Sequence, residues 1–273
     1  MPDLITSRQS EIVKHAARLS SSADFRREQG LFIAEGARLC CDAAKSGAEI
    51  KTLFYTARAG EKYRDYIGVI QAAAQETYEL EPHVAPLLSD TKTPQGVFCV
   101  CGMRRCAVRL DDMEIGFHYL ALENIQDPAN LGTVLRTAEA LGIGGVILGG
   151  SCCDVYSPKV LRASMGAVFR LPFYRQSDLV SAIESLNNRG FVTLAAVPDA
   201  SAKKVTAVNF KCPTVLIVGN EGNGLTSAVI AACSESVTIP MLGRAESLNA
   251  SASAAILMWE MMREKSGGVG NVS

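Results

Sequence analysis

The residues best suited to chemistry gather in the segment GRAESLN, at positions 243–249. This segment follows the apolar run VTIPML and precedes six small residues at 250–255. If the chain is extended there, Ser247 and Asn249 point to one side and Leu248 to the other, because side chains alternate along a strand. Two hydrogen-bonding groups would then face a substrate. The small residues would let the next helix approach a neighbour closely, which taken alone indicates only tight packing.

Three further polar residues stand in apolar surroundings. Glu221 lies between glycines in VGNEGNGL, directly after a buried strand, where a carboxylate must be hydrogen-bonded or face a ligand. Capping of the following helix is the alternative. Asn130 and Arg136 share the expected helix DPANLGTVLRTAEALG, about 9 Å apart along its axis and about 120° apart around it. These two side chains cannot both bind the same ligand group, and Arg136 is either exposed to solvent or has a functional role.

Glycine-containing loops follow three buried strands, at 148–154 (LGGSCCD), 218–225 (VGNEGNGL) and 241–249 (MLGRAESLN). Open α/β sheets bind ligands just outside the carboxyl ends of their strands, so these loops predict a ligand site, with ordinary turns as the alternative. The glycines of GNEGNG are in the order G-x-x-G-x-G, which is not the dinucleotide fingerprint. The chain also has no phosphate-loop lysine and no G-x-S-x-G elbow, which leaves phosphoanhydride chemistry and serine hydrolysis unsupported.

The alternation of short apolar runs with helix-periodic segments predicts an α/β fold. The segment GMRRCAVRLDDMEIGF has no clean period and predicts a link between two domains. We therefore expect a first domain over 1–105, a linker over 106–116, a second domain over 117–266 and a disordered tail over 267–273. The last helix is expected to bury one apolar stripe, made of Leu248, Ala252, Ala255, Ile256, Trp259 and Met262.

Composition narrows the function further. No apolar run approaches the roughly 20 residues of a membrane span, and the N-terminus lacks a secretory pattern, so a cytoplasmic protein without membrane association is expected. The nine cysteines form no C-x-x-C and the three histidines stand alone, which predicts reduced thiols and no metal. Residues 1–110 carry 15 basic and 13 acidic side chains (+2), whereas residues 111–273 carry 12 and 15 (−3). A modest basic patch, or a solvated helix face, is formed by Arg8, Lys14, Arg18, Arg26 and Arg27.

Three long segments resemble the signature motifs of the SpoU family of RNA 2′-O-ribose methyltransferases. They are NIQDPANLGTVLRTAEALGIGGVIL, VLRASMGAVFRLPF, and LIVGNEGNGL with VTIPMLGRAESLNASASAAI. The first part, from SRQSEIVKHAARL to TPQGVFCV, resembles the RNA substrate-binding domain often fused to them. The resemblance implies an L30e-like α/β first domain. It also implies a SPOUT α/β second domain with a mostly parallel sheet and a deep trefoil knot, in which only small side chains let the last helix pass a loop.

The resemblance also implies a bound cofactor, S-adenosylmethionine, held by the knot loops of a homodimer, and it leaves open which site residues come from the partner chain. By position, the cofactor-binding residues are Leu148, Gly149, Gly219, Asn220, Ile239, Met241 and Leu248. The family's catalytic residues fall on Arg136, Asn130, Glu221, Ser247 and Asn249. RNA is the implied partner, with the first domain and its basic patch as the expected contact surface.

The implied reaction is in-line attack of a ribose 2′-hydroxyl on the sulfonium methyl group. The family reading makes Arg136 the base, but a guanidinium does not deprotonate in proteins, so stabilisation of the developing alkoxide is the preferred interpretation. Asn130, Ser247 and Asn249 would position the ribose, and Glu221 would orient Asn130 or Arg136. Ribosomal RNA is favoured as substrate. Transfer RNA ribose methylation, RNA base methylation and a non-catalytic RNA-binding relative remain open.

Overall fold

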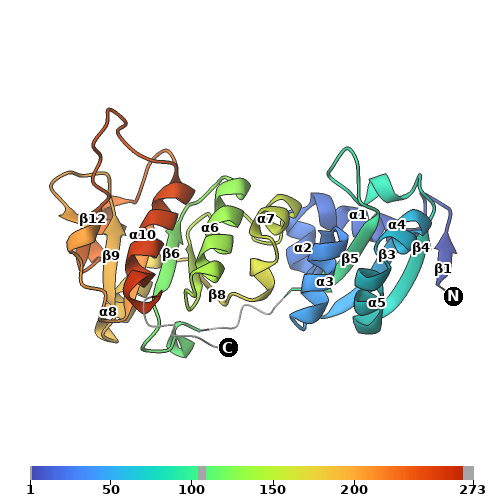
Figure 1. Ribbon diagram of the computed structural model, residues 1–273, viewed down its shortest axis with the longest axis horizontal. Coiled ribbons are helices and arrows are strands. Elements are labelled where there is room, and N and C mark those ends of the chain that lie inside the picture. The colour runs from blue at the N-terminus through green and yellow to red at the C-terminus, as the bar shows by residue number, and fades with distance from the viewer. Residues whose placement is uncertain (1, 104–108, 267–273) are drawn as a thin grey trace. The chain divides into compact units, whose positions relative to one another are not determined.

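The computed structural model describes residues 2–103 and 109–266, and it has the expected α/β architecture (Figure 1). The chain forms two compact units. The first comprises Met1–Arg105 and Asp154–Arg170, and the second comprises Cys106–Cys153 and Leu171–Ser273. The sequence assigned 154–170 to the second domain, and in the structure this segment packs within the first unit instead. The predicted tail at 267–273 lies outside the described residues.

The first unit is built on a five-stranded sheet in the order β1-β4-β3-β5-β2. Its strands are β1 (Asp3–Ile5), β2 (Leu31–Glu35), β3 (Ile50–Thr56), β4 (Ala74–Leu80) and β5 (Val97–Gly102). Its helices are α1 (Glu11–Ser21), α2 (Ala23–Gln29), α3 (Ala37–Lys45), α4 (Ala57–Lys62) and α5 (Arg64–Ala73). Helix α1 buries Val13, Ala16 and Leu19, which lie three residues apart on one face, against a core that includes Phe54 and Phe98.

Side-chain contacts explain why 154–170, with helix α7 (Pro158–Ser164), belongs to the first unit. The ring of Tyr156 stacks on Phe32 of β2, with 4.6 Å between ring centroids. Phe169 also stacks on Phe32, at 6.2 Å. The carboxylate of Asp154 forms a 2.8 Å ion pair with Arg26 of α2. These apolar and charged contacts are long-range in sequence, so local periodicity did not reveal them.

The second unit contains a seven-stranded sheet in the order β10-β12-β9-β11-β6-β7-β8. Its strands are β6 (Tyr119–Glu123), β7 (Val146–Gly149), β8 (Phe173–Gln176), β9 (Val192–Ala196), β10 (Lys203–Lys204), β11 (Thr214–Val218) and β12 (Glu235–Thr238). All neighbouring strands are parallel, which confirms the predicted sheet type. The central strands β6 and β11 are buried along their whole length, as expected for a parallel sheet covered on both faces.

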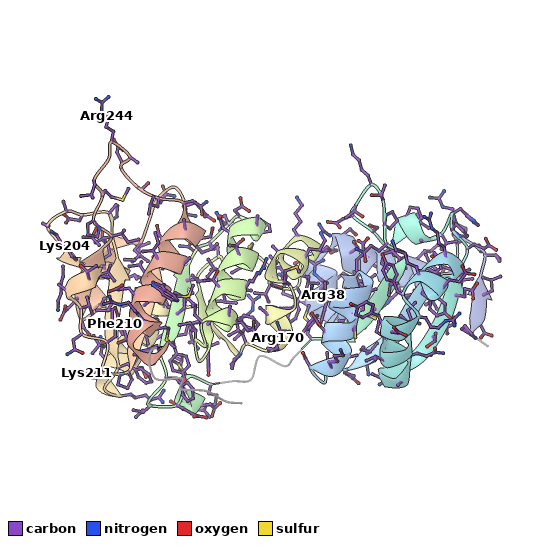
Figure 2. All side chains as sticks on the ribbon, viewed as in Figure 1. Arg38, Arg170, Lys204, Phe210, Lys211 and Arg244 are labelled. Atoms are coloured by element: carbon purple, nitrogen blue, oxygen red, sulfur yellow. The ribbon has the colours of Figure 1, made fainter. Side chains whose placement is uncertain are left out.

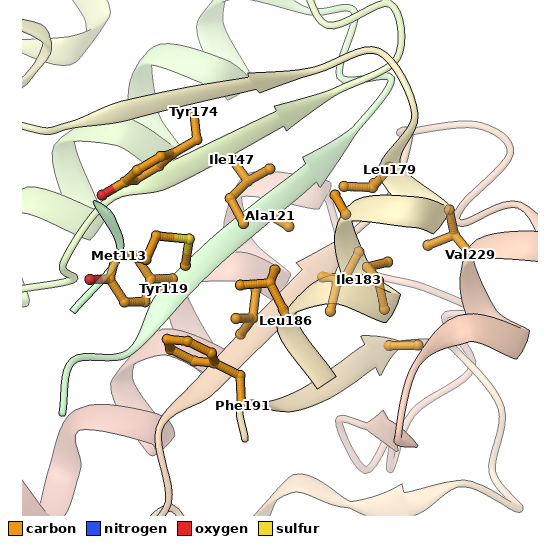
Figure 3. Close-up of a cluster of buried hydrophobic side chains, with 14 of the residues drawn as sticks. Met113, Tyr119, Ala121, Ile147, Tyr174, Leu179, Ile183, Leu186, Phe191 and Val229 are labelled. Atoms are coloured by element: carbon orange, nitrogen blue, oxygen red, sulfur yellow. The ribbon is translucent and has the colours of Figure 1, made fainter. Parts of the chain in front are cut away.

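Helices cover both faces of this sheet. Helices α8 (Leu179–Asn188) and α9 (Ser227–Ala232) pack on one face through a cluster that includes Ala121, Ile147, Ile183 and Leu186 (Figure 3). Leu120 alternates with these strand residues and points to the opposite face. On that side α6 (Pro128–Ala140) and α10 (Ala250–Ser266) pack side by side, and α10 also contacts β11 (Figure 1).

The expected linker at 106–116 is fixed to the second unit from residue 110 onward. Met113 is 2% exposed and lies in the core cluster just described. The guanidinium of Arg189 donates hydrogen bonds to the carbonyl oxygens of Leu110, Asp111 and Met113. This part of the chain is therefore not a free linker. Residues 106–108 lie outside the described residues.

The apolar stripe predicted for α10 is wrong. The helix buries Ala250, Ala254, Leu257, Met258 and Met261, together with Met262. Of the predicted stripe, Ala252, Ile256 and Trp259 are exposed, and Leu248 precedes the helix at 36% exposure. The helix is apolar on two sides, and it packs against α6 and β11, with its small residues Ala250 and Ala254 buried. The small residues thus allow close packing, and the trefoil knot stays a prediction.

Two compositional expectations can be compared with the described residues. No described helix has both the length and the apolar composition needed to cross a membrane. None of the eight described cysteines forms a disulfide bond with another, and no group of three or more metal-ligating side chains occurs in the same residues.

Candidate active site

A cavity of about 570 Å³ lies at the carboxyl ends of β9, β11 and β12, which are neighbours in the sheet. Its walls are the loop 196–202 after β9, the loop 218–225 after β11, and the segments 236–239 and 246–248. Ala250, Ser253 and Leu257 of α10 close it. The volume is typical of a small-molecule site, and the carboxyl edge of a parallel sheet is where such sites form.

The structure places most of the predicted cofactor residues at this cavity. Its lining includes Gly219, Asn220, Ile239, Met241 and Leu248.

Leu148 and Gly149 do not line the cavity. They belong to β7, which pairs with β6 and β8, two positions away from β11. Gly149 packs against Leu179, whose Cδ2 would lie 2.8 Å from an added Cβ. The structure therefore separates these two residues from the cavity, because their loop follows a different strand, and their role in cofactor binding stays a prediction. The missed wall is the loop after β9, VPDASA, which follows a buried strand but contains no glycine.

The loop 219–225 has a backbone geometry that requires glycine at its start. A Cβ on Gly219 would lie 2.3 Å from the carbonyl carbon of Gly224, which no side chain tolerates. Asn220 and Gly224 exchange two backbone hydrogen bonds of 3.0 Å. The Asn220 side chain donates to the Asn124 carbonyl at 2.8 Å and accepts from Gly222 N at 2.9 Å. The loop is therefore a tight, fixed turn.

A buried carboxylate fixes the other end of this loop. Glu123, at the end of β6, is 5% exposed and accepts hydrogen bonds from the backbone N (2.9 Å) and the hydroxyl (2.8 Å) of Thr226. The Thr226 hydroxyl in turn accepts from Val229 N and caps α9. Both ends of the β11 loop are thus bonded to the carboxyl end of β6, one through the Asn124 carbonyl oxygen and the other through the Glu123 carboxylate.

Three of the predicted catalytic residues form one hydrogen-bonded chain. Asn130 Nδ2 donates to Glu221 Oε1 at 3.1 Å, and Asn249 Nδ2 donates to Asn130 Oδ1 at 3.0 Å. Glu221 also accepts from the backbone N of Asp127 (3.1 Å) and Gln126 (3.3 Å). The chain therefore connects the β11 loop, the start of α6 and the start of α10.

The charge of Glu221 orients this chain. Burial raises the pKa of its carboxyl, but the hydrogen bonds from Asn130 and from the backbone outweigh burial, and the pKa is lowered overall. An ionised carboxylate only accepts, so Asn130 must turn its NH₂ toward Glu221 and its oxygen toward Asn249. The oxygen of Asn249 then accepts from Ser251 N at 2.9 Å and caps α10. Each amide in the chain has one defined orientation.

The remaining two catalytic candidates lie outside this chain. Ser247 lines the cavity next to Leu248. Arg136 lies on α6, exposed, and makes no hydrogen bond or ion pair within the described part of the chain. Its charge is therefore available to a ligand from solvent. Asn130 was expected to cooperate with Glu221, and the structure brings those two residues together.

The basic patch of the first unit differs from the prediction at one position. Arg8, Lys14, Arg18 and Arg27 are exposed, as RNA contacts require. Arg26 is 4% exposed, and its guanidinium binds Asp154 and the Leu19 carbonyl oxygen at 2.7 Å. Its assignment as an RNA-binding residue is therefore wrong in this structure, because its donors are used inside the unit.

The comparisons with known proteins cover both units. The SpoU rRNA Methylase family matches residues 118–259, and an MRM3-like substrate binding domain matches residues 10–99. The chain is 29% identical to a 23S rRNA (guanosine(2553)-2′-O)-methyltransferase of Bacillus subtilis, over 94% of this chain and 98% of the relative. It is 30% identical to a 23S rRNA (uridine(2479)-2′-O)-methyltransferase of Streptomyces viridochromogenes, over 97% and 93%.

A solved structure is similar over the same extent. It is an rRNA methyltransferase of Sinorhizobium meliloti with AdoMet bound, which is 31% identical, has a TM-score of 0.85, and covers 96% of this chain and 98% of its own. The family match spans more than half of the chain and includes the cavity and the hydrogen-bonded chain of Asn130, Glu221 and Asn249. The protein therefore belongs to the SpoU rRNA methylase family.

Proposed function

We propose that this methyltransferase transfers the methyl group of S-adenosylmethionine to a ribose 2′-hydroxyl of ribosomal RNA. The observation that carries the proposal is the hydrogen-bonded chain of Glu221, Asn130 and Asn249, which reaches the rim of a cavity of cofactor size. Two relatives that cover almost the whole chain are named as 23S rRNA 2′-O-methyltransferases. They differ in nucleotide, so the position methylated by this chain does not follow from them.

The cavity fits S-adenosylmethionine. It presents apolar side chains from Ile239, Met241 and Leu248, and a loop whose glycines expose backbone groups. Its described lining contains three carboxylates and no lysine or arginine, which suits a ligand with a sulfonium and an ammonium group. When bound, S-adenosylmethionine supplies an electrophilic methyl group, so the protein mainly has to orient the nucleophile.

The chain's own residues would then act on the ribose. Asn249 and Ser247 would hold the nucleotide by hydrogen bonds, and Asn130 would keep Asn249 in its donating orientation. Glu221 is a positioning residue, since its oxygens already accept several donors. Arg136 would stabilise the negative charge that develops on the 2′-oxygen, because a guanidinium remains protonated and donates in a planar fork.

The first unit is proposed to hold the RNA, since it matches a substrate binding domain and carries exposed basic residues. In the full chain, Arg8→Glu combined with Arg18→Glu should weaken RNA binding. Each lost phosphate contact should reduce the slope of log affinity against log salt by about 0.7–0.9. Lys204→Glu combined with Lys211→Glu, two exposed charge reversals in the second unit (Figure 2), is the matched control. If the control weakens RNA binding as much as the change in the first unit, the proposal that the first unit holds the RNA is contradicted.

A homodimer is proposed through the exposed apolar side of α10. Trp259 is 53% exposed and Ile256 is 42% exposed, one turn apart on this helix. Leu242, in the long loop whose tip carries Arg244 (Figure 2), is fully exposed. Trp259→Lys should convert a dimer into a monomer in size-exclusion chromatography with light scattering. A wild-type protein that is monomeric at all concentrations would contradict this assembly.

The target is tested by mapping ribose methylation across total RNA from cells with and without the gene. The proposal predicts loss of a 2′-O-methyl group from ribosomal RNA alone. Loss from transfer RNA would identify the alternative substrate, and loss of a base methyl group would identify the alternative reaction. An unchanged methylation map would contradict the proposed function.

A further inference from the structure

The loop after β9 places a carboxylate at the cofactor cavity. Residues 197–202 follow the last residue of β9, and Asp199 and Ser201 of this loop line the cavity wall. Asp199 Oδ1 accepts hydrogen bonds from both the backbone N and the hydroxyl of Ser201, each at 2.8 Å. These two bonds fix the carboxylate and occupy one oxygen. They leave Oδ2 without a hydrogen bond within the described residues.

The other two carboxylates of the cavity differ from Asp199. Glu221 is engaged with Asn130 and with backbone donors, as described above. Glu246 lies in the exposed loop that precedes α10 and makes no hydrogen bond within the described part of the chain. Asp199 alone is both held in one orientation and supplied with a free acceptor oxygen. The Ser201 hydrogen bonds also lower the pKa of its carboxyl, so it is ionised at neutral pH.

We infer that Asp199 is a specificity-determining residue that accepts a hydrogen bond from S-adenosylmethionine at the β9 wall of the cavity. This inference rests on the proposed function. The cofactor offers two kinds of donor outside its adenine, the ammonium group of its methionine part and the ribose hydroxyls. Both are recognised by an ionised, pre-oriented carboxylate, and charge-assisted hydrogen bonds of this kind are the stronger ones. The residue lies outside the segments that carry the family motifs.

The test measures binding directly, by calorimetry on the full chain. Asp199→Asn keeps an oxygen for the Ser201 bonds but loses the charge. It should raise the dissociation constant of S-adenosylmethionine about tenfold, the lower end for a hydrogen bond to a charged group because the site is exposed. The affinity for S-adenosylhomocysteine should fall by the same factor, since this compound keeps the same donors. 5′-Methylthioadenosine, which lacks the ammonium, separates the two sources. If Asp199→Asn leaves the affinity for 5′-methylthioadenosine unchanged, the ammonium group is the donor to Asp199. If it weakens that affinity as much as the affinity for S-adenosylmethionine, a ribose hydroxyl is the donor.

Two control variants show whether the effect is specific to the carboxylate of Asp199. Asp178→Asn removes the charge from an aspartate that also accepts from the backbone N and the hydroxyl of a serine, Ser181, through its two oxygens. It does not line the cavity, so the change should leave all three affinities unchanged. Ser201→Ala keeps the carboxylate and removes one of the bonds that hold it, so its effect should be smaller than that of Asp199→Asn.

The inference is overturned if Asp199→Asn binds all three compounds within twofold of the wild type. It is also overturned if Ser201→Ala reproduces the whole loss, because the carboxylate would then only hold the loop. A wild-type protein that does not bind S-adenosylmethionine would instead contradict the proposed function. The two failures are therefore distinguishable in one set of titrations.

Discussion

Replacement of Asn130 by alanine tests the role of the hydrogen-bonded chain separately from that of the cofactor cavity. Asn130 is 9% exposed and bonds Glu221 at 3.1 Å and Asn249 at 3.0 Å, but it does not line the cavity. A hydrogen bond to an ionised partner contributes about 1.5–3 kcal/mol and a neutral one about 0.5–1.5 kcal/mol. Glu221 and Asn249 are exposed, so water replaces much of what is lost. We expect the free energy of unfolding to fall by only about 1–2 kcal/mol.

The effect on methyl transfer should be larger than the effect on stability. Without Asn130 the NH₂ group of Asn249 loses its acceptor, and only the bonds from Ser251 and Ala252 to its oxygen still orient the amide. Loss of one pre-oriented donor lowers the rate of comparable enzymes by about 100-fold or more, and we expect kcat/KM to fall by that amount. The affinity for S-adenosylmethionine should stay within about twofold of the wild type, since the cavity wall is unchanged.

The assay combines transfer of tritiated methyl groups at saturating cofactor with a calorimetric cofactor titration. Thr133→Ala, an exposed position on the same helix, is the control and should affect neither. In a double-mutant cycle of Asn130→Ala with Glu221→Gln, the effects on kcat/KM should be strongly non-additive, because both residues belong to the same hydrogen-bonded chain. If Asn130→Ala lowers cofactor affinity as much as turnover, or leaves turnover intact, the assigned role of the chain is refuted.

Three other outcomes are expected. Arg136→Ala should abolish methyl transfer without changing cofactor affinity, and Arg136→Lys should not rescue it because the planar fork is lost; wild-type turnover in either variant would refute the assignment. Ala254→Leu should destabilise the protein by about 1–3 kcal/mol through overpacking against α6 and β11, whereas an unchanged thermal melt would show that this face of α10 is not closely packed. The pKa of Glu221 is lowered in the folded protein, so the stability that its ionised carboxylate contributes should be present above the ordinary pKa of 4.5 and lost as pH falls through the folded value. The free energies of unfolding of the wild type and Glu221→Gln should therefore become more similar as the pH is lowered.

The sequence predicted those parts of the fold that have a strong local pattern. The strands expected before the loops at 148–154, 218–225 and 241–249 are present as β7, β11 and β12. The expected helix DPANLGTVLRTAEALG is α6, where the Asp127 side chain accepts from Ala129 N. The strand β4 was missed because its sequence, AQETYEL, is largely polar and its residues are mostly half-buried or exposed, with only Leu80 fully buried. Its pairing with β1 and β3 depends on contacts distant in sequence.

The site was predicted in part, for reasons that the structure makes clear. Glycine and motif patterns located the β11 loop and the residues of the hydrogen-bonded chain. The β9 loop was missed because it contains no glycine, and only the strand order shows that β9 lies between β11 and β12. The buried face of α10 was misassigned because the helix is apolar on two sides. Burial of Arg26 followed from a partner, Asp154, that lies 128 residues away.

The position of the transferred methyl group tests the central claim most directly. The purified protein is incubated with methyl-tritiated S-adenosylmethionine and ribosomal RNA from cells that lack the gene, and the RNA is then hydrolysed in alkali. Alkaline cleavage requires a free 2′-hydroxyl, so a ribose-methylated nucleotide stays linked to its neighbour. The account predicts that the label elutes in alkali-resistant dinucleotides. Label in mononucleotides would show base methylation and would contradict the account.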